Sequence, residues 1–81
     1  MATDFTSITD DQLELIRDHA GWKNYGYEAT MNDYTVETIS RCDAGIERTA
    51  DALIAEGIDP DEAVVWDGAQ WRPAHDPYEG N

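Results

Sequence analysis

Positive charge is what this sequence has least of. Its 81 residues include 5 lysines and arginines against 18 aspartates and glutamates, which gives a formal net charge of −13. So acidic a surface repels nucleic-acid phosphates and anionic membranes, which excludes direct binding to either as the basis of function. The apolar content of 41% is nevertheless too high for an acidic disordered tail.

Cysteines and long apolar runs are also scarce. The single cysteine, Cys42, excludes an internal disulfide framework and favours a reducing, cytoplasmic setting. No run of 18 apolar residues is present, and residues 1–15 lack the basic start of a secretory signal. The length predicts a single acidic domain, residues 1–81, in which residues 1–8 and 74–81 are loosely ordered.

Two helices are predicted from the spacing of apolar residues. Thr9 to Gln12 forms a capping box, and the helix that follows is expected to cover residues 10–20 and to stop at Gly21. The second helix is predicted over residues 35–56, with one apolar stripe made of Val36, Ile39, Cys42, Ile46, Ala50 and Leu53. In an alternative interpretation, residues 34–38 form a second strand and this helix begins near Asp43.

Strands are predicted where apolar residues alternate. Residues 22–31 show a period of two, which is typical of a half-buried strand. Asp59 and Pro60 begin one helical turn, and the Asp67-Gly68 pair predicts a hairpin between residues 64–66 and 69–72. The predicted fold class is α+β, with two helices packed on a small, mostly antiparallel sheet in the order α-β-α-β-β.

Residues that carry catalytic or metal chemistry are few and badly spaced for it. His19, expected in the last turn of the first helix, and His75 lack a ligand-type partner at i+3 or i+4. A calcium loop beginning at Asp59 would place Val64 where a glycine is required. Cys42 lies within an apolar stripe, which predicts a buried hydrophobic side chain. We therefore predict no catalytic residue, no metal, no cofactor and no enzyme activity.

Carboxylates recur at helical spacing instead. Two rows with the pattern Asp-x3-Glu-x3-Asp are predicted as partner-binding sites, namely Asp10, Glu14 and Asp18, and Asp43, Glu47 and Asp51. An accessory acidic group consists of Asp59, Asp61 and Glu62. We expect the rows to form an ordered array on one side of the protein, although like charges four residues apart destabilise each helix slightly. Most tyrosines and tryptophans are expected to pack in the core and sheet, with a few beside the acidic surface as interface anchors.

In its size, acidity, single cysteine and absence of catalytic motifs, the chain resembles small phage-encoded inhibitors that mimic DNA, of the anti-CRISPR and anti-restriction type. The resemblance lies in the overall profile of the chain, and no motif carries it. It implies a protein that acts in a bacterial cytoplasm on the basic nucleic-acid groove of a CRISPR surveillance complex, nuclease or restriction enzyme. Two alternatives are an acidic domain of a salt-adapted organism and a small regulatory or antitoxin-like module that binds another protein.

Overall fold

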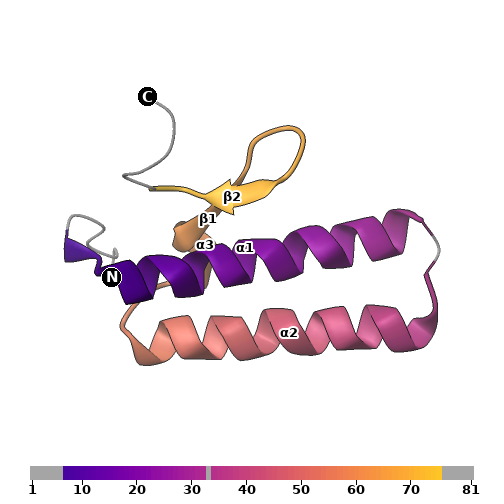
Figure 1. The fold of residues 1–81 in the computed structure, drawn as a ribbon, viewed down its shortest axis with the longest axis horizontal. Helices are drawn as coiled ribbons and strands as arrows, with labels where there is room; N and C mark the ends of the chain where they lie inside the picture. The colour runs from indigo at the N-terminus through magenta and orange to yellow at the C-terminus, as the bar shows by residue number, and fades with distance from the viewer. Residues whose placement is uncertain (1–6, 33, 76–81) are drawn as a thin grey trace.

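The computed structural model describes residues 7–32 and 34–75. In chain order, its elements are α1 (Asp10–Met31), α2 (Val36–Ala55), α3 (Pro60–Ala63), β1 (Val64–Trp66) and β2 (Trp71–Pro73). The helices α1 and α2 lie antiparallel, and the β-hairpin lies on the opposite side of α1 (Figure 1). The first helix is therefore the middle layer of the molecule.

The first helix begins as predicted and ends eleven residues later than predicted. The Thr9 hydroxyl accepts a hydrogen bond from the Gln12 amide at 3.1 Å, and the Gln12 side chain accepts one from the Thr9 amide at 3.0 Å, which confirms the capping box. The helix continues through Gly21 to Met31, so the predicted strand over residues 22–31 is wrong. Gly21 faces open space on the outside of α1, where a glycine lowers helix stability without ending the helix.

The second helix has nearly the bounds that its apolar stripe predicts. It covers Val36–Ala55, and the Thr35 hydroxyl caps it by accepting a hydrogen bond from the Thr38 amide at 3.3 Å. The alternative strand over residues 34–38 is therefore wrong. Gly57 follows the helix with φ of +76°, the left-handed conformation in which glycine commonly ends a helix.

The third helix is a single turn, as predicted, and leads directly into the hairpin. The Asp59 carboxylate caps it by accepting a hydrogen bond from the Asp61 amide at 2.9 Å. The strands β1 and β2 pair antiparallel with Trp66 opposite Trp71, which confirms a hairpin around Asp67 and Gly68. The loop covers residues 67–70, so the second strand begins two residues later than the predicted 69–72. The Asp67 carboxylate shapes the loop by accepting hydrogen bonds from the amides of residues 69 and 70, both at 2.9 Å.

The core lies where α1, α2, α3 and the hairpin meet. Its buried residues are Ile16, Ala20, Leu53, Ile58, Ala63 and Val64, with Ile8, Leu15 and Trp71 packed against them. Of the ends predicted to be loosely ordered, residues 1–6 and 76–81 lie outside the described residues. Within the described part, Ile8 packs on the core and the Ala74 amide donates a hydrogen bond to the Ala63 carbonyl at 2.9 Å.

The fold is α+β in the broad sense, with mostly helical structure and one two-stranded antiparallel sheet. The predicted order α-β-α-β-β is wrong in its first strand, because that segment is the second half of α1. The predicted packing of both helices on the sheet also differs, since the sheet packs mainly on α1 and reaches α2 only at the shared core (Figure 1).

Candidate functional site

All nine carboxylates that the sequence predicts as partner-binding are exposed. They are Asp10, Glu14 and Asp18 on α1, which we call the α1 acidic row; Asp43, Glu47 and Asp51 on α2, the α2 acidic row; and Asp59, Asp61 and Glu62, the α3 acidic cluster. In the α3 acidic cluster, the Asp59 carboxylate already caps the α3 helix. The two rows are therefore the more extensive acidic surfaces open to a partner.

The two rows do not share one face of the protein. The helices face each other through His19 and Thr49, whose side chains are 2.8 Å apart. At about 100° per residue, Glu14 lies about 140° around α1 from His19, and Glu47 lies about 160° around α2 from Thr49. Glu14 and the α2 acidic row therefore point away from the other helix, whereas Asp18, about 100° around α1 from His19, lies at the side of α1 next to Trp22. The expected one-sided array is wrong, and the rows line opposite edges of the helix pair.

The basic residues do not neutralise these rows. The Lys23 ammonium lies 3.8 Å from the centre of the Trp71 ring, the Arg48 guanidinium lies 5.6 Å from that of Trp22, and Arg72 lies 3.7 Å from the Asp67 carboxylate. Within residues 7–32 and 34–75, no ion pair involves Glu14, Asp18 or the three carboxylates of the α2 acidic row. Arg17 lies beside the α1 acidic row, while the carboxylates of Glu14, Asp18 and the α2 acidic row stay available to an external cation.

The edge of α1 is hollowed along its acidic row. One hollow of about 470 Å³ is lined by Asp10, Leu13, Glu14, Arg17 and Asp18. A second hollow of about 260 Å³, which we call the aromatic pocket, is lined by Arg17, Asp18, Gly21, Trp22 and Tyr25. The two hollows share Arg17 and Asp18, so they adjoin between the start of α1 and its aromatic residues.

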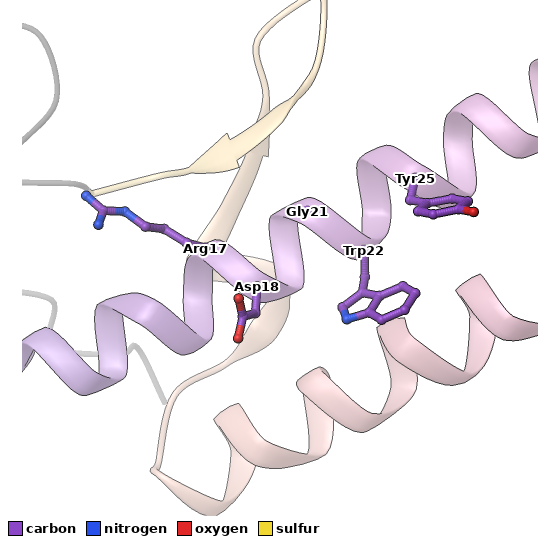
Figure 2. A pocket seen from close by; sticks show the side chains of 5 residues that line it. All are labelled: Arg17, Asp18, Gly21, Trp22 and Tyr25. Atoms are coloured by element: carbon purple, nitrogen blue, oxygen red, sulfur yellow. The ribbon is translucent and has the colours of Figure 1, made fainter.

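The aromatic pocket combines two rings, a carboxylate and an uncovered stretch of backbone (Figure 2). The rings of Trp22 and Tyr25 are stacked, with centroids 6.1 Å apart and planes at 22°. Gly21 lies beside them, and a Cβ at this position would meet nothing within 4 Å. The Arg17 side chain points away from the rings (Figure 2). Tyr25 is the more exposed of the two rings.

The sequence interpretation missed the aromatic pocket because it placed Trp22 and Tyr25 in a strand. On a continuous helix, Asp18, Trp22 and Tyr25 follow one another at i, i+4 and i+7, which places them on one face. The α1 acidic row therefore continues directly into the aromatic residues. The i, i+4, i+7 spacing was the signal that could have revealed the pocket.

Two further candidate residues, Cys42 and His19, are buried. Cys42 is buried against the other helix, as predicted. His19 is not in the last turn of α1, as the sequence interpretation had it, but in its buried middle. There Nδ1 donates to the Thr49 hydroxyl, because that hydroxyl donates to backbone carbonyls of its own helix. Burial lowers the pKa of His19 below 6.5, and nearby Lys23 lowers it further, while Asp61 opposes this shift.

Comparisons with known proteins assign no function to this chain. The chain matches no protein-family model, no curated protein and no solved structure. Across residues 7–32 and 34–75, no three or more His, Cys, Asp and Glu side chains are grouped so as to hold a metal ion. In the same part of the chain, no helix has the length and apolar character needed to cross a bilayer.

Proposed function

We propose that this protein is a non-enzymatic inhibitor that occupies the basic nucleic-acid groove of a larger protein, as a DNA mimic of the anti-CRISPR or anti-restriction type. The observation that supports this proposal best is the pair of exposed acidic rows on opposite edges of the helix pair. In this proposal, the partner is a CRISPR surveillance complex, nuclease or restriction enzyme, and the setting is the cytoplasm of a bacterial host cell.

Two acidic edges suit a groove that normally encloses a duplex. Two packed helices with their side chains form a rod about 20 Å across, and the carboxylates of each row advance by about 6 Å per step. A duplex likewise presents its charge along two strands on either side of a rod. Basic side chains on both walls of a groove would therefore meet carboxylates on both edges of this protein.

The charge also sets how such a complex forms. A net charge of −13 attracts a basic groove over long distance, which speeds association and makes it sensitive to salt. The carboxylates are already held on folded helices, so little ordering is needed when they bind. Binding through this surface is therefore expected to be fast and to weaken steeply as salt increases.

The test is competition for a nucleic-acid-binding protein. A labelled duplex bound to a CRISPR surveillance complex or restriction enzyme should be released by the chain, and release should weaken by at least tenfold between about 50 and 200 mM salt. Two double reversals, Glu14→Lys with Asp18→Lys and Asp43→Lys with Glu47→Lys, should each weaken release tenfold or more.

The matched control changes the net charge by the same amount outside the rows. Glu28→Lys with Glu37→Lys adds the same four units of charge and should weaken release much less than either row reversal. If all three double variants weaken release of the duplex equally, the effect depends on net charge alone, and the proposal that the rows mimic DNA is wrong. If one row reversal leaves release unchanged, that row is not part of the interface.

The two alternatives predict different solution behaviour. Exposed acids outside the rows, such as Glu28 and Glu37, fit an acidic domain of a salt-adapted organism, which would gain most of its thermal stability only at molar salt. Met31 and Val36 are 64% and 79% exposed near the turn between α1 and α2, which fits a protein-binding regulatory module. A stable homodimer in sedimentation experiments would favour that module.

A further inference from the structure

We propose that the aromatic pocket binds an arginine side chain of the partner. This inference rests on the proposed function and names the chemical group that α1 recognises. A pocket of about 260 Å³ has the scale of one side chain rather than of a typical small-molecule site. Its lining also includes Arg17, whose side chain points away from the rings (Figure 2), so an incoming group meets two rings and one carboxylate, which suit a guanidinium.

The rings and the carboxylate act on different parts of the guanidinium. A planar guanidinium stacks on the face of tryptophan or tyrosine and is attracted by the negative charge of that face. The Asp18 carboxylate, at the same pocket, accepts hydrogen bonds from the N–H groups at the rim of the guanidinium. Gly21 provides the room, because no side chain covers the backbone between Asp18 and Trp22.

Cations of this chain already lie over two of its rings, and one of these rings, Trp22, lines the pocket. The Arg48 guanidinium from α2 already lies over the Trp22 ring, at 5.6 Å from its centre. On the other side of α1, the Lys23 ammonium lies 3.8 Å from the centre of the Trp71 ring. The Tyr25 ring is 46% exposed and stacks on Trp22, so it offers the next aromatic surface to an incoming guanidinium.

Charge complementarity identifies the occupant as part of a basic partner. The α1 acidic row and the pocket share Asp18, so a basic surface that aligns with the row places an arginine at its aromatic end. A second copy of this chain is the wrong occupant on charge, because two copies would each bring a net charge of −13. The pocket would therefore anchor the partner at a single residue beside the less specific acidic row.

The probes are two hexapeptides of equal charge, acetyl-(Gly-Arg)₃-amide and acetyl-(Gly-Lys)₃-amide. They are titrated at low salt into the full chain, and the indole resonance of Trp22 and the amide resonance of Gly21 are followed by NMR. Lysine binds the acidic row as a point charge. The arginine guanidinium can also stack on an aromatic ring and donate two hydrogen bonds to one carboxylate, so the arginine peptide should bind about 5–10-fold more tightly.

Two variants test the pocket directly. Gly21→Leu fills the open space beside the rings and, as a better helix former than glycine, should keep the fold. It should reduce binding of the arginine peptide to the level of the lysine peptide. Asp18→Asn should reduce the arginine preference at least threefold and remains informative if Gly21→Leu fails to fold. Ala44→Leu and Glu37→Gln, which make similar changes on α2 outside both rows, should leave the preference unchanged.

The possible outcomes separate this inference from the proposed function. Equal affinity of the wild-type chain for both peptides, or an arginine preference that survives Gly21→Leu, overturns the pocket even if the chain still releases bound duplex. A preference that disappears with Gly21→Leu supports the pocket even if no duplex is released. A dimer that Gly21→Leu dissociates in sedimentation experiments would show that a second copy fills the pocket, which also overturns the proposal.

Discussion

The indole ring of Trp22 on α1 lies directly over the Cα of Gly45 on α2, so a Cβ at position 45 would overlap ring atoms. The sequence marks Gly45 only as a weak point in the helix, because glycine lowers helix stability by about 1 kcal/mol relative to alanine. In the structure, this glycine is what allows the two helices to approach. It also holds one of the two rings of the aromatic pocket in place.

The first prediction therefore compares two glycines. Gly45→Ala should lower the free energy of unfolding by about 1–2 kcal/mol, because overpacking outweighs the gain in helix propensity. Gly21→Ala, where the added methyl group meets nothing, should raise it by up to about 1 kcal/mol. Urea denaturation followed by circular dichroism measures both. Equal gains in the two variants would contradict the close contact between Trp22 and Gly45.

The second prediction concerns the attachment of the hairpin to α1. The Asn24 side-chain amide donates to the Trp71 carbonyl at 2.8 Å and accepts from the Trp71 amide at 2.6 Å. Asn24→Ala leaves both backbone groups without these partners and should lower the free energy of unfolding by about 1–3 kcal/mol. Gln70→Ala, an exposed change in the same hairpin, should have almost no effect. Equal stability of the two variants would show that the amide does not hold the hairpin.

The third prediction is a dependence of stability on pH. Burial lowers the pKa of His19 in the folded state, so above about pH 6.5 the side chain is neutral in both states and this group does not affect stability. As the pH falls below 6.5, the unfolded state takes up the proton first and stability decreases, until the lower pKa of the folded state is passed. Chemical denaturation between pH 5.5 and 7.5 should show this decrease in the wild-type chain.

Replacing the histidine isolates its contribution. His19→Gln keeps a side-chain N–H for the Thr49 hydroxyl and should flatten the stability profile between pH 5.5 and 7.5. Asp67 cannot produce the same slope. Hydrogen bonds from the backbone lower the pKa of its carboxyl below 3.8, so its contribution is lost only at more acidic pH. A profile that still slopes in His19→Gln would assign the effect to another group.

The fourth prediction links stability and binding in the α2 acidic row. Glu47 has an aspartate four residues away on either side, so Glu47→Lys replaces two repulsions with two attractions. It should raise the free energy of unfolding by about 1 kcal/mol, while it weakens release of the duplex. Glu37→Lys adds the same charge beside Arg41 and should instead lower stability slightly. A destabilised Glu47→Lys would contradict the strain assigned to this row.

The sequence predicts α2 well and only half of α1, for a physical reason. The second helix buries one face, so its apolar residues recur at helical spacing. The first helix contacts two neighbours, α2 through Trp22 and Gly26 and the hairpin through Asn24 and Tyr27. The alternating apolar residues that suggest a strand do not mark one buried face, because Tyr25, Tyr27 and Met31 are exposed and only Ala29 is buried.

The sequence predicted which carboxylates form the acidic rows, but it did not predict where the rows lie on the folded protein or that the aromatic pocket exists. Helical spacing alone identifies the two acidic rows, whose residues are all exposed. Their placement on opposite edges depends on which side of each helix meets the other, which the contact between His19 and Thr49 determines. The aromatic pocket depended on α1 continuing past Gly21, and that continuation comes from tertiary packing that local sequence does not encode.

The contact between Lys23 and Trp71 has a practical consequence for anyone who labels this protein. Lys23 is the only lysine in the sequence, and its ammonium lies against an indole that belongs to the hairpin. Acylation of this amine should be slow while the hairpin is docked and faster once it detaches. The rate of that single reaction, read by mass spectrometry, would therefore serve as an intrinsic reporter of hairpin opening and would leave every carboxylate untouched.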